Sequence, residues 1–228
     1  MFKKIIKFFS PVEWGFIFLG IAVVVLSFCF STDKSVLALI TSILGIIMIL
    51  LNSKGVIWAQ IVCMIYGVLY SIHSCMQQYY GEMLIYLFIM TPMYVITFIN
   101  WLKNRNEKTA SVEINSISKK EWLILSGCIA VATVGFYFLL VALNTDNPLL
   151  SAFPLITCAL ASYLLFRRSE YYAIAFIVND VFLIVLWTQK LFSVGTAVLP
   201  SVMCFVIFLV IDTYSFISWK IRKRKQRE

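Results

Sequence analysis

The sequence predicts an all-α integral membrane protein with eight transmembrane helices. Hydrophobic residues make up 61% of its 228 residues, and the mean hydropathy is +0.92. Charged residues make up 13%, about half the share of roughly 25% that is usual in soluble domains. Eight apolar runs have the length of about 17–25 residues that a helix needs to cross the hydrocarbon. The runs are continuous rather than alternating, which favours helices over a membrane barrel.

The first run, 14–30, follows Lys3, Lys4 and Lys7. It is longer than the roughly 7–15 apolar residues of a signal peptide, and no small-residue cleavage site follows it. We therefore expect a retained helix rather than a cleavable signal. Short polar breaks separate most of the runs, but the segment 103–121 is long and polar. The other seven runs are 35–51, 56–76, 83–102, 122–143, 149–166, 171–188 and 196–219.

Basic residues are distributed unevenly between the two sides that eight spans define. All but two of the 19 Lys and Arg residues fall on the side of the termini, and the exceptions are Lys34 and Lys190. Basic loops resist translocation, so both termini are predicted to lie in the cytoplasm. The net charge of +8 therefore indicates topology rather than nucleic-acid binding. We interpret the basic tail 220–228 first as a topology anchor, with attraction of anionic lipid head groups as the alternative.

An internal repeat is indicated by the ends of two runs. The segments 97–101 and 215–219 both read small-Phe-Ile-polar-Trp before a basic residue. Lys54 and Arg168 are 114 residues apart in the sequence, as are Gly81 and Gly195. The pattern predicts two parallel three-helix repeats, 35–103 and 149–219, joined by a cytoplasmic loop and linker helix over 104–148. With an extra helix in 1–34, this 3+1+3 order resembles the SWEET sugar transporters, in which such repeats enclose the substrate near mid-membrane.

Ionisable and amide side chains inside a membrane face protein or a wet cavity, because burial in lipid costs a few kcal/mol. Asn179 and Asp180 lie in the middle of the seventh run and are the first candidates for contact with a solute. The alternative is that they hydrogen-bond neighbouring helices. The other candidates are Gln60, His73 and Asp212. A lone histidine gives no metal site, so no metal is expected.

Aromatic residues could complete a site around these groups. Trp187 follows Asp180 by seven residues, so both side chains are predicted on one helical face, and Tyr66 and Tyr70 are spaced four apart in the same way. Such a cage with one carboxylate suits a flat cationic solute. The six cysteines form no C-x-x-C pair and are read as buried small hydrophobes. The chain has no nucleotide-binding or hydrolase motif, so neither an enzyme nor a cofactor is predicted.

The segment 80–88, with Pro92-Met93 and Trp101-Leu102-Lys103, resembles the PnuC-type vitamin transporters. The resemblance is looser in the second half, at Asn179-Asp180 and Leu186-Trp187. It implies transport of nicotinamide riboside, thiamine, riboflavin or deoxynucleosides by facilitated diffusion, with trapping by a separate cytosolic kinase. The resemblance also implies that Asn179, Asp180 and Trp187 face the substrate, with Tyr66 and Tyr70 opposite. Relatives often have Trp where this chain has Tyr172 and Ala175 or Phe176, and commonly Asn at the position of Tyr66.

We therefore expect a carrier in the inner cell membrane, with nicotinamide riboside as its first cargo. Thiamine or another vitamin or nucleoside is the alternative within the family, a sugar is a further one, and a non-transporting scaffold subunit is the alternative of another class. Membrane lipid and a small solute are the expected partners, nucleic acid is not, and a homo-oligomer is left open. The predicted substrate-binding residues are Asn179, Asp180, Trp187, Tyr66, Tyr70 and Gln60.

Overall fold

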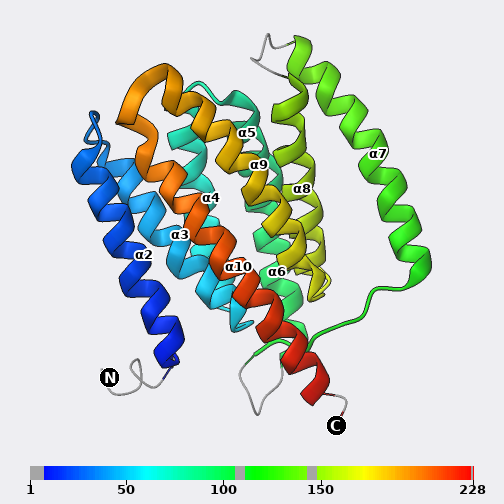
Figure 1. The fold of residues 1–228 in the computed structure, drawn as a ribbon. Coiled ribbons are helices and arrows are strands. Elements are labelled where there is room, and N and C mark those ends of the chain that lie inside the picture. Colours follow the sequence, from blue (N-terminus) through cyan, green and yellow to red (C-terminus); the bar gives the residue numbers. More distant parts are fainter. Residues whose placement is uncertain (1–7, 106–110, 143–147, 227) are drawn as a thin grey trace.

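The computed structural model describes residues 8–105, 111–142, 148–226 and 228, and it is built from helices (Figure 1). The basic residues Lys3, Lys4, Lys7, Lys108 and Arg227, which entered the topology prediction, lie outside the described residues. Two isolated β-bridges, Val56 with Ser111 and Arg105 with Val112, are the only extended pairings in the described part. The helices in chain order are α2 (Pro11–Phe30), α3 (Val36–Ser53), α4 (Ala59–Met76), α5 (Tyr80–Ile85), η1 (Tyr86–Met90), α6 (Thr91–Lys103), α7 (Lys119–Ala142), α8 (Pro148–Phe166), α9 (Tyr171–Val194), η2 (Gly195–Val198) and α10 (Leu199–Lys225).

The predicted all-α class is confirmed for the described residues. Seven stretches there are long and apolar enough to cross a membrane. The last stretch, Tyr171–Lys225, is 55 residues long and contains α9, η2 and α10. At its middle, Gly195 has a φ of 71°, a left-handed conformation that glycine adopts without strain, and the chain turns back there. Figure 1 shows α9 and α10 lying side by side on either side of this turn.

Two helices extend beyond the apolar runs that predicted them. Helix α9 continues to Val194, and α10 continues into the basic tail as far as Lys225. Lys and Arg are good helix formers, and their charge is favourable in the last turn, where the helix dipole is negative. The basic tail is thus largely an extension of the last helix.

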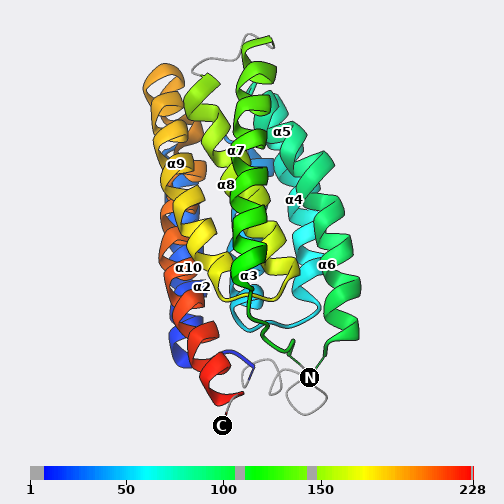
Figure 2. The ribbon, with the colours of Figure 1, turned by 90° about the vertical axis from the view of Figure 1, so that its right-hand side faces the viewer.

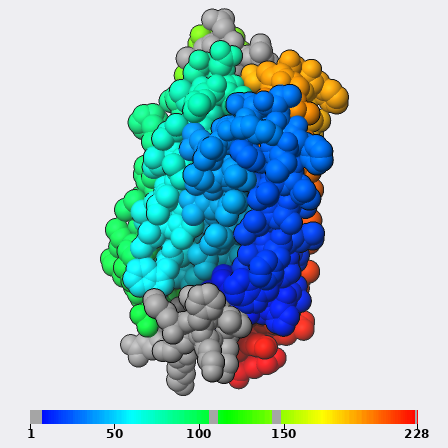
Figure 3. Space-filling view, turned by 90° about the vertical axis from the view of Figure 1, so that its left-hand side faces the viewer, coloured from blue at the N-terminus to red at the C-terminus, as the bar shows by residue number. Residues whose placement is uncertain are grey.

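The helices form a bundle with α2 and α7 at its margins. We call the end where α2 begins and α10 ends the termini end, and the other the opposite end (Figure 1). Figure 3 shows α2 and α3 beside each other on one face, next to α4. Helix α7 packs along α8 on the other side and stands apart from the rest (Figures 1 and 2). Leu140 is the only residue of α7 that is buried within the described structure.

The fourth run is interrupted by the π-helical turn η1 between α5 and α6. Pro92 lies in the first turn of α6 and has no N–H, so the regular hydrogen-bond ladder cannot continue through it. The carbonyl of Tyr86 accepts from both the backbone N–H and the hydroxyl of Thr91, the latter at 2.7 Å. Gly67 of α4 lies against this turn, since a Cβ there would be 2.5 Å from Oγ1 of Thr91. The turn thereby brings Tyr86 into the centre of the bundle.

Candidate functional site

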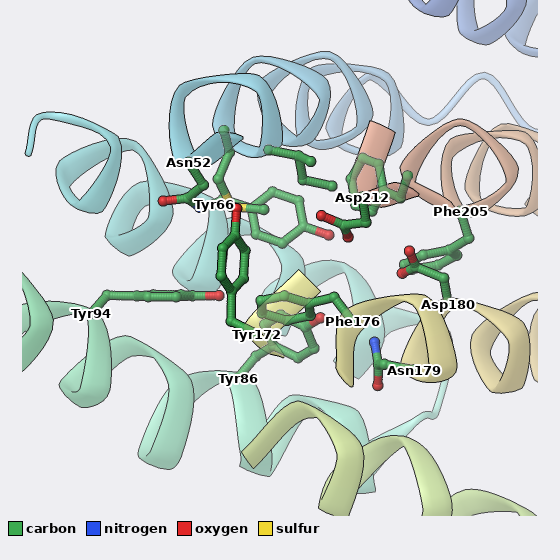
Figure 4. A pocket seen from close by; sticks show the side chains of 13 residues that line it. Asn52, Tyr66, Tyr86, Tyr94, Tyr172, Phe176, Asn179, Asp180, Phe205 and Asp212 are labelled. Carbon is green, nitrogen blue, oxygen red and sulfur yellow. The ribbon is translucent and has the colours of Figure 1, made fainter. Parts of the chain in front are cut away.

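A cavity lies in the centre of the bundle, between helices of the first predicted repeat and helices of the second (Figure 4). Its empty space is about 420 Å³ counted with its mouth, and only a small part of that space is wide enough for water. It therefore holds little more than a few waters in this conformation. The lining residues are Met48, Ile49, Asn52, Tyr66, Tyr86, Tyr94, Tyr172, Phe176, Asn179, Asp180, Phe205, Phe208 and Asp212.

Two carboxyl groups enter this cavity from adjacent helices. Asp180 of α9 and Asp212 of α10 are each only 2% exposed, and their carboxyls lie next to each other (Figure 4). Oδ2 of Asp180 has no hydrogen-bond partner among the described residues. The neighbouring Asn179 accepts a hydrogen bond from the hydroxyl of Thr157 at 3.0 Å, between its Oδ1 and Oγ1. Asn179 is thus oriented by α8, while Asp180 keeps an unused acceptor in the cavity.

A chain of amides supports the cavity at its termini end. Asn52, at the end of α3, lines the cavity and donates from Nδ2 to the sulfur of Cys63 at 3.2 Å. Gln60 does not line the cavity, but its Nε2 donates to Oδ1 of Asn52 at 2.9 Å. Both amide side chains are buried, at 5% and 0% exposure. Gln60 therefore positions Asn52 rather than facing the cavity itself.

Aromatic rings form most of the cavity wall. Tyr66 and Tyr70 stack with ring centroids 5.5 Å apart and an interplanar angle of 10°, as their spacing predicted. Phe208 of α10 packs on Tyr66 at 6.2 Å. Rings at such distances and angles attract each other through their quadrupoles, and their faces attract cations. The wall is therefore suited to a flat, electron-poor ring.

A second, smaller cavity lies towards the opposite end. It has an empty space of about 220 Å³. Tyr66 and Phe205 line both cavities and so stand between them. The other residues that line it are Ala38, Thr41, Ser42, Tyr70, His73, Ser201 and Cys204. The two cavities form a path along the bundle axis that these two rings interrupt.

A polar aromatic cluster closes this path further towards the opposite end. Trp187 is fully buried, stacks on His73 with ring centroids 5.4 Å apart, and donates from Nε1 to the hydroxyl of Tyr70 at 3.2 Å. That hydroxyl in turn donates to the carboxyl of Glu82 on α5. A ring nitrogen of His73 lies 3.0 Å from the hydroxyl of Ser201 on α10. The cluster joins helices of both predicted repeats.

The structure brings some of the predicted site residues together and separates others. Asn179, Asp180 and Tyr66 line the central cavity, and so does Asp212. Tyr70 lines the second cavity, Gln60 lies behind Asn52, and Trp187 lies in the closing cluster rather than beside Asp180. The cavity residues that sequence reasoning did not select include Asn52, Tyr86, Tyr94, Tyr172, Phe176, Phe205 and Phe208. Of these residues, only Tyr172 and Phe176 were marked in the sequence, by the resemblance to a family that often has Trp at these positions.

The comparison with known families decides the class of the protein. The sequence model described as "Nicotinamide mononucleotide transporter" matches residues 35–221. The chain belongs to this family. As a member of the nicotinamide mononucleotide transporter family, it is a multi-pass membrane transporter and not an enzyme. The predicted resemblance to PnuC-type transporters is confirmed.

Two individual proteins are similar to this family member along nearly its whole length. The nicotinamide riboside transporter PnuC of Neisseria mucosa is 29% identical over 216 residues, which cover 92% of this chain and 81% of the relative. A solved structure titled "Crystal structure of the Vitamin B3 transporter PnuC" superimposes with a TM-score of 0.84 at 24% identity. The superposition covers 95% of this chain and 94% of the other. The fold is therefore that of a PnuC transporter.

Proposed function

We propose that this protein carries nicotinamide riboside across the inner cell membrane. The observation that carries the proposal is the central cavity, where aromatic rings surround two carboxyl groups and no Lys, Arg or His is among the described lining residues. The pyridinium ring of nicotinamide riboside is flat and positively charged, so aromatic faces and carboxylates attract it. Asn52 and Asn179 offer amide groups to the ribose hydroxyls and the carboxamide. The name of the Neisseria mucosa relative supports this cargo.

Transport requires the bundle to open, because the cavity in this conformation is too small for a nucleoside. Small-molecule pockets typically measure about 300–1,000 Å³, whereas most of the space here is closed to water. The cargo would enter from one end when Tyr66 and Phe205 separate from their neighbours, and leave after the halves rock. Of the six predicted binding residues, Asn179, Asp180 and Tyr66 would contact cargo in the central cavity. Tyr70 and Trp187 would contact it at the opposite end, and Gln60 would act through Asn52.

The proposed topology has eight spans with both termini in the cytoplasm. The turn at Gly195 supports it, because it lets α9 and α10 cross separately. The placement of Lys and Arg also supports it. The orientation is tested by single cysteines at Asp33 and Arg105, in a background where the exposed Cys29, Cys75 and Cys128 are replaced by Ser. An impermeant maleimide should label the Asp33→Cys variant in intact cells and the Arg105→Cys variant only after permeabilisation. The reverse labelling pattern would show that both termini lie outside the cytoplasm.

Two matching hydrogen bonds support the proposed repeats, 35–103 and 149–219. Nε1 of Trp101, at the end of α6, donates to the carbonyl of Leu165 at the end of α8, at 3.1 Å. Nε1 of Trp219 in α10 donates to the carbonyl of Asn52 at the end of α3, at 3.0 Å. Each tryptophan thus ties the last helix of one triplet to the first helix of the other. This exchange is what a two-fold axis along the membrane normal requires.

The proposed energetics is facilitated diffusion, with retention of cargo by a separate cytosolic kinase. Proteoliposomes containing the purified protein should take up radiolabelled nicotinamide riboside until the concentrations inside and outside are equal. An enclosed riboside kinase with ATP should then raise the retained label above that level. Accumulation without the kinase would indicate ion coupling instead.

A competition panel separates the alternative cargoes. Nicotinamide riboside should compete best, and thiamine, riboflavin, deoxynucleosides and sugars should compete less. Preference for thiamine would identify a different vitamin as the cargo, and preference for a sugar would identify the protein as a sugar carrier. Uptake of none of these solutes, in vesicles where the protein is folded, would favour the scaffold subunit.

A further inference from the structure

We propose that Asp212 and Asp180 together hold one net negative charge in the central cavity and so select a solute with a single positive charge over a neutral solute of the same shape. This inference rests on the proposed function and adds to it the basis of charge selection. It also gives a role to Asp212, which no sequence motif assigned.

The two carboxyl groups face the same space from adjacent helices. Figure 4 shows Asp180 entering from α9 and Asp212 from α10, with their oxygens towards the cavity. Each side chain is 2% exposed, and each carboxyl lies beside the other. Such a pair cannot be a surface feature that water screens. Any charge on it must be compensated inside the protein or by what binds there.

The cavity offers these carboxyls little compensation. The titratable groups that line it with them are the phenols of Tyr66, Tyr86, Tyr94 and Tyr172, which are neutral. Oδ2 of Asp180 is buried and has no hydrogen-bond partner among the described residues. An unpaired acceptor aimed into the cavity indicates that a ligand supplies the missing partner.

The charge of the pair follows from the closeness of its members. Two carboxylates in contact in a medium of low dielectric repel each other strongly, so such pairs share a single proton. The shared proton lies in a hydrogen bond between the two groups and leaves one net negative charge. A monocationic ring beside the pair makes the cavity neutral, whereas a neutral ring leaves the negative charge without a partner.

Helix packing is the competing explanation, since buried polar groups also join membrane helices through hydrogen bonds. The two explanations differ in what the pair does to cargo selection. A packing contact between α9 and α10 would affect stability equally for every solute. A charge-selecting pair would affect the ratio between charged and neutral solutes in the same folded protein.

The test compares nicotinamide riboside with benzamide riboside, an isostere in which carbon replaces the charged ring nitrogen. Both compete for uptake of labelled nicotinamide riboside into proteoliposomes, and the ratio of their inhibition constants is measured. The wild type should favour the cation by about tenfold or more, as expected when a buried charge is left without its partner. The double variant Asp180→Asn/Asp212→Asn has no carboxyl left in the cavity and should lower this ratio towards one, whereas either single Asn variant keeps one carboxylate and should retain it. Glu13→Gln, which removes a buried carboxyl of α2 that lines neither cavity, should retain it.

The outcomes distinguish the two proposals. Equal competition by both ribosides in the wild type, or an unchanged ratio in the double Asp variant, would overturn charge selection and leave nicotinamide riboside transport intact. Failure of the wild type to take up labelled nicotinamide riboside at all would overturn the proposed function, and the inference would fall with it. The wild-type ratio needs no variant, so the inference can be refuted even if one substitution prevents folding.

Discussion

Gly45 of α3 lies so close to Phe208 of α10 that a Cβ on the glycine would be 2.3 Å from Cζ of the ring. The same Cβ would be 2.9 Å from Cε2 of Tyr66. Both distances are shorter than van der Waals contact, so only glycine fits between these rings. The contact lies where the first predicted repeat meets the second, and it fixes two rings of the cavity wall.

Replacing this glycine should therefore disturb both packing and transport. We expect Gly45→Ala to destabilise the protein by about 1–3 kcal/mol, the usual effect of overpacking a filled core. Uptake should fall as Tyr66 and Phe208 move. Thermal unfolding in detergent and uptake in proteoliposomes measure the two effects. Gly135→Ala is the matched control, because nothing lies within 4 Å of a Cβ there. Equal behaviour of the two variants would contradict the packing argument.

The two tryptophans at the termini end should contribute to stability rather than to cargo recognition. Trp219→Phe and Trp101→Phe each remove an indole hydrogen bond to a carbonyl that keeps a backbone donor, which typically costs about 0.5–1.5 kcal/mol. The midpoint of thermal unfolding should fall in both variants, while the affinity of the folded fraction for cargo stays the same. Trp58→Phe, at a residue that is 68% exposed, serves as the control. A selective loss of affinity in Trp219→Phe would show that its role was misassigned.

Gln60 should act on cargo through Asn52. The substitution Gln60→Met removes the donor to Oδ1 of Asn52 while keeping a similar volume. A hydrogen bond of this kind is worth about 0.5–1.5 kcal/mol, so KM should rise by roughly threefold to tenfold with a smaller change in maximal rate. Uptake kinetics in proteoliposomes provide the measurement. Gln189→Met, at an exposed position on α9, should leave both parameters unchanged. If Asn52→Leu had no effect on KM, the amide chain would have no part in binding.

Tyr70 should hold the opposite end of the path closed. Tyr70→Phe removes the hydroxyl that accepts from Trp187 and donates to Glu82. We expect the cluster to loosen and Cys204, which is buried beside the second cavity, to react faster with a small maleimide. The measurement uses protein whose exposed cysteines are replaced by Ser. Tyr137→Phe on α7 is the control, and unchanged labelling in Tyr70→Phe would refute the closing role.

The fold was largely predictable because the bilayer restricts it so strongly. Continuous apolar runs must become helices in lipid, and the described residues form helices over these runs. The ends of α9 and α10 were less predictable. Polar residues such as Gln189 and Lys220 interrupt an apolar run, but they do not stop a helix.

The site was predicted only in part because periodicity fixes the face of a helix but not its neighbours. Asp180 and Trp187 lie on one face, as predicted, yet seven residues separate them by about 10 Å along the axis. Trp187 therefore meets His73 and Tyr70 instead of the central cavity. Asn52 was missed because it follows an apolar run and reads as part of a turn. Tyr94 and Phe208 look like ordinary membrane aromatics until the tertiary structure brings them together.

The two rings that separate the cavities, Tyr66 and Phe205, have a consequence for the proton gradient across the membrane. An uninterrupted file of water through the bundle would let protons leak inwards and discharge the electrochemical gradient. The aromatic layer, which lines both cavities, breaks that file between them. In this conformation the bundle therefore gives protons no continuous row of water molecules from one end to the other.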